Sequence, residues 1–332
     1  MGQNSAKGKQ QHNIKKVLIT SASKKISLIK SVKNASAKIN TFILVIAGDV
    51  DEHCLAKFVA DDFWMMPATV DIELMAILNG CIERGIDIVI PTRNSELGFW
   101  TRNIDKFMQK DIRIIVSPKF TIEICLDKIA FAEYGARNGL PFIPASLNPD
   151  DFDNMPLVVK ERYGVGSQNL GINLNKDKAR AHARSLQNPI FQPFIAGTEI
   201  SVDAWLDLNH HVKGIVLRTR DRIVHGESQV STTFRNKAIE SIMVKVFEML
   251  RLRGPAVLQA IIDDQGNPNI IECNPRFGGA STTSIAAGLD MWYWTLLEAS
   301  GTDIAEYSFQ RIMGEVRQIR IPQDIYEYDI DF

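Results

Sequence analysis

The chain has 332 residues, of which 45% are hydrophobic and 23% charged, a composition typical of soluble globular proteins with two or three packed domains. Its formal net charge of -1 excludes a global basic field for nucleic acid or for an acidic membrane surface. No apolar run approaches the roughly 18 residues that a membrane span needs. We therefore expect a cytoplasmic protein with no nucleic-acid or membrane partner, and a disordered tail over residues 1–13.

Residues 14–120 alternate between short apolar runs and stretches with helical periodicity, a pattern that predicts a doubly wound parallel sheet. The loop after the first strand, Ser21–Lys25, contains no glycine, so a backbone approach to a dinucleotide pyrophosphate is not expected. The domain is therefore predicted to be structural and free of cofactor. The predicted strands span residues 16–20, 41–47, 87–91 and 112–116, with a helix over 72–85.

The third strand ends in the segment Pro91-Thr92-Arg93-Asn94-Ser95-Glu96. Ligands in parallel sheets gather at the carboxyl ends of strands, so Glu96 is a candidate for facing a substrate. A second interpretation fits equally well: Asn94 or Ser95 caps a helix and Glu96 is exposed.

The second part of the chain mixes strands and helices. Residues 148–154 are rich in Asp, Asn and Pro and are predicted to be a linker. The four cysteines lack metal-ligand spacing, which favours buried reduced thiols. Strands are predicted at 141–144, 156–160, 171–174, 189–195, 198–206, 212–218, 257–263 and 269–276, and helices at 127–139, 236–252 and 282–299.

The hairpin near the end of the chain has the strongest chemical signal. Its second strand reads Glu272-Cys273-Asn274-Pro275-Arg276, so Glu272, Asn274 and Arg276 share one face, with Gln259 on the partner strand. Glu, Asn and Gln oxygens suit Mg²⁺. An arginine beside them would add a fixed cation for a phosphate or carboxylate. The alternative is a surface hairpin with ordinary polar residues.

Two further segments carry weaker signals. The strand that ends at Lys160 leads into a loop with glycines. Such a loop would bend over phosphates while the lysine pairs with their oxygens. A lysine at a strand end before a glycine turn is, however, common in itself. The run from Phe191 to Asp203 passes through a Gly turn to Glu199 and would offer backbone bonds to an adenine and a carboxylate to a ribose. An ordinary hairpin fits this second segment too.

Other polar groups remain open between a substrate role and a structural role. Arg218, Arg220 and Arg222 alternate and are predicted to share one strand face, with a solvated edge strand favoured over an anionic substrate site. The run Ser281–Thr283 would either line an acceptor pocket or cap the next helix.

Together, and in their order along the chain, the three segments resemble ATP-grasp enzymes, especially a single synthetase unit of the carbamoyl phosphate synthetase large chain. The resemblance extends from Val17 to about Leu297 and is most specific from Asp127 to Gly279. It implies an α/β protein in which a pre-ATP-grasp domain (14–120) precedes an ATP-grasp domain of two α+β subdomains (121–332), with a lid over about 155–192. The lid loop has fewer glycines than the synthetase version, and there is no duplicated half, so carbamoyl phosphate synthesis itself is not expected.

The resemblance also implies roles for individual residues. Catalytic cations would be Lys128, Lys160 and Arg276, and magnesium ligands would be Gln259, Glu272 and Asn274. The nucleotide would contact Lys128, Lys160, Val165, Gly166, Ser167, Gln192, Phe194, Glu199 and His225. On its own, His225 fits a solvated loop residue equally well.

The implied activity is that of a carbon–nitrogen ligase. Mg-ATP, with Mn²⁺ as an alternative ion, would phosphorylate a substrate carboxylate to an acyl phosphate, which an amine or another nucleophile then attacks. Two alternatives remain: a carboxylase-like enzyme that activates bicarbonate or carbamate, and a non-catalytic ATP-binding regulatory protein. The expected partners are a small carboxylate and an amine, and because many relatives are dimers, a homodimer is also compatible.

Overall fold

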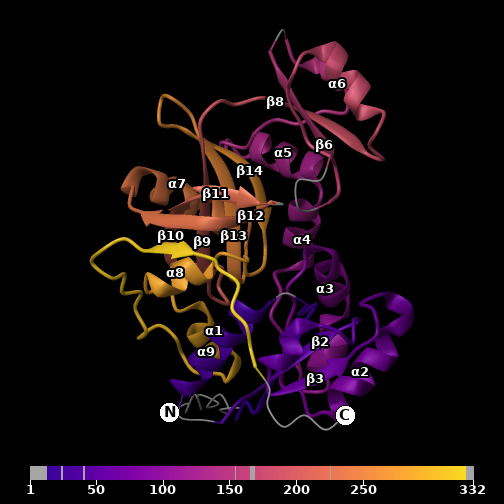
Figure 1. Cartoon of the computed structure of the whole chain (residues 1–332), viewed down its shortest axis with the longest axis vertical. Helices are drawn as coiled ribbons and strands as arrows, with labels where there is room; N and C mark the ends of the chain where they lie inside the picture. The colour runs from indigo at the N-terminus through magenta and orange to yellow at the C-terminus, as the bar shows by residue number, and fades with distance from the viewer. Residues whose placement is uncertain are drawn as a thin grey trace, which may run out of the picture.

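The computed structural model describes residues 13–23, 25–39, 42–153, 155–164, 169–224 and 226–326. It has an α/β part at one end, a large antiparallel sheet in the middle and a small sheet with one helix at the other end (Figure 1). No helix among the described residues is both long and apolar enough to cross a membrane.

The N-terminal sheet is fully parallel, with the strand order β3-β2-β1-β4-β5. This order confirms the predicted doubly wound sheet. The strand β3 was not predicted; it is only four residues long and begins with a charged aspartate. Its elements are β1 (Lys16–Thr20), α1 (Ile26–Ala37), β2 (Leu44–Asp49), β3 (Asp62–Met65), α2 (Leu74–Glu83), β4 (Ile88–Ile90), α3 (Asn94–Met108) and β5 (Arg113–Ile114).

A large antiparallel sheet follows, with the order β11-β12-β10-β9-β13-β14 and with β15 paired to β12. Helix α7 packs on its β10 strand. The predicted mixed architecture is confirmed, although β11, β12 and β15 were not predicted. The members of this region are α4 (Lys119–Leu126), α5 (Lys128–Arg137), β9 (Thr198–Leu206), β10 (Val212–Thr219), β11 (Arg222–Val224), β12 (Glu227–Phe234), α7 (Lys237–Met249), β13 (Gly254–Ile262), β14 (Pro268–Asn274) and β15 (Arg317–Ile319).

The small sheet has the order β7-β6-β8 and carries helix α6 (Lys176–Ala183). Its strands are β6 (Leu157–Glu161), β7 (Gly171–Leu174) and β8 (Pro189–Pro193), and its own core includes Leu157, Val159 and Phe191. In Figure 1 this unit lies above α5, away from the α/β part. Short 3₁₀ turns occur at Leu55–Phe58, Asp71–Glu73 and Pro149–Asp151.

The single helix predicted over 282–299 is wrong. The structure has two helices there, α8 (Thr282–Ala286) and α9 (Met291–Ala299). Gly288 between them has a φ of +104°, which glycine adopts readily and a helix does not. A Cβ at this position would lie 2.3 Å from the carbonyl oxygen of Gln310, so the chain can pass here only without a side chain.

One apolar core joins the two ends of the chain. It combines α1 residues such as Ile29 and Val32 with α9 residues such as Trp292 and Leu296, all buried. Helices α1 and α9 are in direct contact. The α/β part and the large sheet are therefore packed as neighbours over a shared core, which fixes the loops that face each other between them.

Candidate functional site

A cavity of about 880 Å³ lies where the N-terminal sheet, the large sheet and the small sheet meet. Its size suits a small ligand such as a nucleotide with a second substrate. All nine described members of the predicted site line this one cavity: Lys128, Lys160, Gln192, Phe194, Glu199, Gln259, Glu272, Asn274 and Arg276. The remaining four predicted residues, Val165, Gly166, Ser167 and His225, lie outside the described residues.

The hairpin β13–β14 brings the three candidate metal ligands together. Gln259 is directly opposite Glu272, and Val257 is opposite Asn274, with a bulge at the neighbouring Ile271 that shifts the register. No group of three or more His, Cys, Asp or Glu side chains is placed to hold a metal within the described part of the chain. The set Gln259, Glu272 and Asn274 has a single carboxylate, and its oxygens fit an ion that takes its other ligands from phosphate and water, as Mg²⁺ does.

Asn274 is already held by hydrogen bonds. Its Nδ2 donates to Glu272 Oε1 at 2.9 Å, and its Oδ1 accepts from Asn94 Nδ2 at 2.6 Å and from Arg276 Nη2 at 3.2 Å. Arg276 Nε in turn donates to Asn94 Oδ1 at 2.7 Å. Asn94 therefore orients both Asn274 and Arg276 from the N-terminal domain, a role that the sequence did not reveal beyond placing Asn94 after a strand end. A metal on Asn274 Oδ1 would compete with these two donors.

The two lysines approach from the opposite side. Lys128 begins α5, and its Nζ donates to the carbonyl oxygens of Arg162 and Gly164 at 3.3 and 3.2 Å. Burial is the main cause that lowers the pKa of Lys160 to about 8; the charge of Lys128 adds to the shift, and the charges of Glu272 and Glu199 oppose it. Burial also lowers the pKa of Lys128. Both side chains are thus desolvated cations that share Glu272 as a neighbouring acid, an arrangement that favours a polyanionic ligand.

The predicted nucleotide hinge lies along β8 and the loop after it. Gln192 is buried and donates to the carbonyl oxygen of Ile143 at 3.2 Å, while the backbone N–H of Phe194 donates to the carbonyl oxygen of Pro156 at 2.8 Å. Gly197 has a φ of +156°, and a Cβ there would lie 2.2 Å from the carbonyl oxygen of Ile262. The Gly turn predicted before Glu199 therefore requires glycine.

The solvated edge strand favoured for the three arginines is wrong for two of them. Arg218 is buried and donates from Nε to Asp203 Oδ2 at 2.7 Å, while Arg220 lies between strands and pairs with Glu199. Only Arg222, on β11, is exposed. Because Arg218 and Arg220 line the cavity, they belong to the site. The carboxylate of Glu199, which also lines the cavity, is paired with Arg220.

The structure also bears on two open alternatives. Both interpretations of Glu96 are wrong: it is buried and does not line the cavity, and Arg93, not Asn94 or Ser95, is the N-cap of α3. Glu96 accepts the backbone N–H groups of Thr92 and Arg93 at 2.8 and 2.9 Å and so holds the start of α3. Ser281 is buried as well, and it accepts from the Gly278 N–H at 3.0 Å and donates to Asp203. These contacts show that Ser281 braces the loop above Arg218.

The fold is that of the ATP-grasp proteins. Residues 185–320 match a family described as "ATP-grasp in the biosynthetic pathway with Ter operon", and residues 17–115 match "PylC-like, N-terminal domain". These matches confirm the ATP-grasp resemblance predicted from the sequence. No curated protein has a matching sequence.

Solved structures agree on the fold. The biotin carboxylase domain of Hydrogenobacter thermophilus 2-oxoglutarate carboxylase, in complex with MgADP, ADP and bicarbonate, has a TM-score of 0.72 at 20% identity, over 92% of this chain and 74% of that chain. N5-carboxyaminoimidazole synthetase from Staphylococcus aureus, complexed with ADP, has 0.70 at 15% identity, over 90% and 81%. L-amino acid ligase from Bacillus licheniformis has 0.65 at 19% identity, over 87% and 74%.

Proposed function

We propose that the protein is an ATP-dependent ligase that activates a substrate carboxylate as an acyl phosphate and transfers the acyl group to an amine or another nucleophile. The observation that carries this proposal is the convergence of Lys128, Lys160, Arg276 and the oxygens of Gln259, Glu272 and Asn274 on one cavity. The carboxylase, synthetase and ligase structures with the same fold support it, two of them as nucleotide complexes.

The cavity's own residues divide the work of phosphoryl transfer. Gln259, Glu272 and Asn274 would hold Mg²⁺ or Mn²⁺, which bridges phosphate oxygens and neutralises their charge. Lys128 and Lys160 would bind the phosphates from the small-sheet side, and Arg276 would stabilise charge on the transferred phosphoryl group from the opposite side. Val165, Gly166 and Ser167 of the predicted lid, with Gln192, Phe194, Glu199 and His225, would hold the nucleotide.

No general base is needed for the first step, because a carboxylate is already ionised near neutral pH. Its oxygen attacks the γ-phosphorus, the bond to the β–γ bridging oxygen breaks, and ADP leaves. The nucleophile then attacks the acyl carbon and releases phosphate. A small sheet closing over the cavity would keep water from this intermediate.

A second candidate is activation of bicarbonate, because the H. thermophilus neighbour was solved with a bicarbonate anion. The two candidates use the same phosphate site and differ only in the acid. We also propose a cytoplasmic location, in keeping with four buried free cysteines, and a homodimer, the assembly named for the H. thermophilus domain.

The test is ADP release from Mg-ATP in the presence of pools of carboxylic acids or bicarbonate, with hydroxylamine as a general nucleophile that traps acyl phosphates. We expect one pool to stimulate ADP release and Glu272→Gln to reduce kcat by about a hundredfold or more, because the only carboxylate of the metal set becomes neutral. Glu133→Gln, an exposed helix position, is the matched control. If Mg-ATP does not bind in calorimetry, the proposal fails; binding without any turnover would instead support a regulatory protein.

A further inference from the structure

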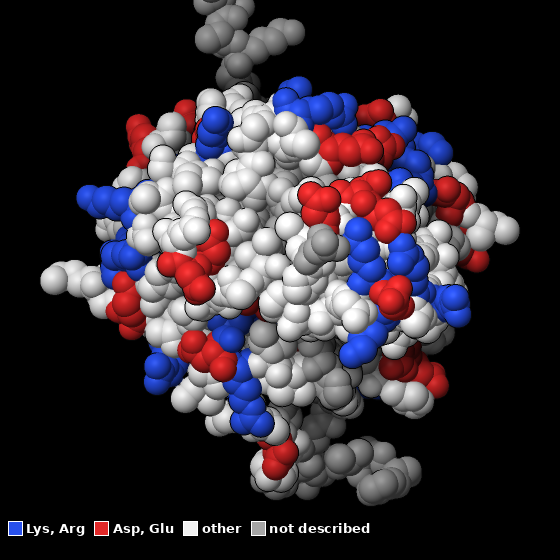
Figure 2. Space-filling model, turned by 90° about the horizontal axis from the view of Figure 1, so that it is seen from above, with Lys and Arg blue, Asp and Glu red and all other residues white. Residues whose placement is uncertain are grey.

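The end of the cavity next to the N-terminal domain is strongly basic. Eight Lys and Arg side chains but only four Glu side chains line the whole cavity, against a net charge of -1 for the chain. Five of these cations form what we call the basic end: Lys25, Arg93, Arg218, Arg276 and Arg320. The molecular surface seen from the α6 end mixes both signs of charge (Figure 2).

Lys25 shows how crowded these charges are. It follows β1 on the loop that lacks glycine and is half-buried at the start of α1. Burial lowers its pKa, the charges of Arg276, Arg93 and Arg320 lower it further, and only Glu227 opposes them. Three cations from other segments of the chain thus act on Lys25 against one acid, an arrangement that a bound anion would stabilise.

Arg218 and Arg320 of the basic end are paired with acids, but their guanidinium groups have further N–H donors. Arg320 donates to Glu227 at 3.0 Å, and Arg218 donates from Nε to Asp203. Arg218 Nη1, however, is buried and has no hydrogen-bond partner among the described residues, although the side chain is only 4% exposed. Buried guanidinium donors are almost always satisfied, so this one favours an acceptor brought by a ligand.

The loop beside Arg218 carries two glycines. A Cβ at Gly278 would lie 2.7 Å from Ser281 Oγ and 3.9 Å from Arg218 Nη2, so the loop from β14 to α8 passes directly over the guanidinium. A Cβ at Gly279 would meet Arg320 Nη1 at 3.7 Å. Both glycines line the cavity, so the loop adds no side chain there between the cavity and Arg218 or Arg320.

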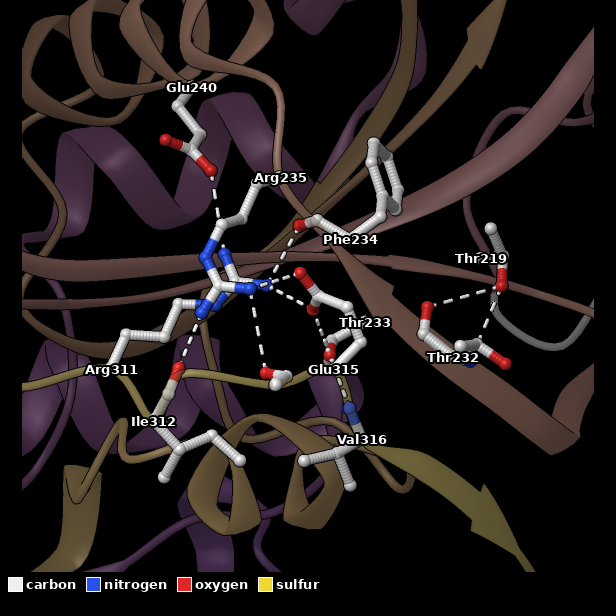
Figure 3. Close-up of polar contacts among 11 residues, drawn as sticks. Thr219, Thr232, Thr233, Phe234, Arg235, Glu240, Arg311, Ile312, Glu315 and Val316 are labelled. Carbon is white, nitrogen blue, oxygen red and sulfur yellow. Dashed lines mark hydrogen bonds and ion pairs between the residues drawn. The ribbon is translucent and has the colours of Figure 1, made fainter.

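Arg320 is held in place by an anchored C-terminal strap, residues 309–320. In Figure 3, Arg311 contacts Glu315 at 2.7 Å, the carbonyl of Phe234 at 2.9 Å and Glu240 at 3.5 Å, and Arg235 also pairs with Glu315. Strand β15 then pairs with β12 and ends beside Arg320. These contacts of the strap fix the position of Arg320 at the cavity.

The two ends of the cavity have different sets of neighbouring charges, although Glu272 acts on both Lys160 and Arg276. The charges that act on Lys160 are those of Glu272, Lys128 and Glu199, whereas those that act on Lys25 are Arg276, Glu227, Arg93 and Arg320. Among the described residues, Lys25, Arg93 and Arg276 form no ion pair. One reacting carboxylate beside Arg276 would compensate a single charge, and Glu227, the acid that acts on Lys25, is already paired with Arg320.

We propose that the basic end binds a second anionic group of the acid that is activated, so that the substrate is a dianion, such as a dicarboxylate or a phosphorylated carboxylate. This inference rests on the proposed function. The reacting carboxylate lies at Arg276, near Glu272 and Asn274, and the second anionic group lies between Lys25, Arg93 and Arg218 Nη1. The N-terminal domain, which supplies Lys25 and Arg93, is then a specificity element.

The experiment uses the full chain with saturating Mg-ATP and hydroxylamine, and compares acids in matched pairs: butanoate with succinate, pentanoate with glutarate, alanine with aspartate, and glycerate with 3-phosphoglycerate. We expect kcat/KM to favour the dianion of at least one pair by about tenfold or more, because charged hydrogen bonds are strong. Lys25→Gln should remove this preference by raising KM for the dianion, with the kcat at saturation and the affinity for Mg-ATP retained. The carboxylate and phosphate arms identify the second group.

The matched control is Lys30→Gln, which removes an exposed lysine from the same helix and should leave all constants unchanged. Three outcomes would each overturn this inference and leave the proposed function intact. They are equal kcat/KM within every pair, a preference for the dianion that persists in Lys25→Gln, and no stimulation by any dianion although Mg-ATP binds. Failure of Mg-ATP to bind would overturn the proposed function instead.

Discussion

At the scale of single residues, Lys160 is the most strongly perturbed cation in the cavity. Burial is the main cause that lowers its pKa to about 8, and the neighbouring Lys128 adds to the shift. Near neutral pH the side chain is still mostly protonated, but it loses its charge within the range in which enzymes are assayed. Phosphates bound beside it would restore the charge, because an anion stabilises the ammonium form.

We therefore predict that the affinity for Mg-ATP falls as the pH rises through about 8. Below this pH Lys160 is charged and binds phosphate directly; above it, the free protein must take up a proton when the nucleotide binds, which costs up to about tenfold in affinity per pH unit. Calorimetry at pH 7, 8 and 9, in buffers of different ionisation enthalpy, measures both the affinity and the proton uptake.

Lys160→Arg is the control for this prediction, because a guanidinium stays charged over the whole range. Its affinity for Mg-ATP should be nearly independent of pH, even if it is weaker than that of the original chain at pH 7. Identical pH profiles for the two proteins would show that another group is responsible.

The parts of the candidate site that depend on residue type and local spacing were predictable from the sequence. The alternation in β14 placed Glu272 and Asn274 on one face, and the hairpin placed Gln259 opposite. The contacts that orient these groups were not predictable. Asn94 meets Asn274 across 180 positions of sequence, and no local pattern encodes a contact between residues so far apart.

At the scale of elements, apolar strands were predicted well and polar ones were missed. β12 (Glu227–Phe234) and β15 (Arg317–Ile319) carry Ser, Thr, Gln and Arg on both faces, so neither has the alternation that identifies a half-buried strand. Their partners, and not their own sequences, make them strands. The break between α8 and α9 was not predicted, because a single glycine such as Gly288 within a helical pattern is usually tolerated.

The strap provides a prediction at the same scale. Glu315 accepts from Thr233 at 2.6 Å and pairs with Arg311 and Arg235. Burial would raise its pKa, but the bond from Thr233 and the arginine charges prevail and hold it below its usual value. We expect Glu315→Gln to speed hydrogen exchange at the amides of Val316–Arg320 and to raise KM for the acid substrate, because Arg320 is no longer fixed.

Glu306→Gln serves as the matched control, since Glu306 is an exposed acid of the preceding loop. Its exchange pattern and KM should equal those of the original chain. Protected β15 amides in Glu315→Gln would mean that the strand pairing with β12 anchors the strap without the ion pairs. Because the carboxylate form of Glu315 makes these contacts, the original chain should also lose strap protection as the pH falls through the lowered pKa.

At the scale of the whole molecule, the site depends on how the N-terminal domain meets the large sheet. Lys25 and Arg93 come from loops at the carboxyl ends of β1 and β4, and Asn94 begins the helix after β4; this is the edge where parallel sheets bind ligands. Their position relative to Arg276 is fixed by the core that α1 and α9 share. A specificity site built across two domains needs such a rigid connection, because a shift of about 1 Å weakens a charged hydrogen bond severely.

This shared core predicts that the N-terminal domain and the large sheet unfold together. Trp292 is fully buried in it, and Trp292→Ala should lower the free energy of unfolding by about 3–5 kcal/mol, as large cavities do. The loss should appear equally in hydrogen exchange of β1 and β4 and of β9 and β13. Trp292→Phe keeps most of the ring and removes an indole N–H that has no partner among the described residues, so it should cost much less. If the exchange of β1 and β4 is unchanged in Trp292→Ala, the two parts are stable independently, and the basic end must be held together by the ligand itself.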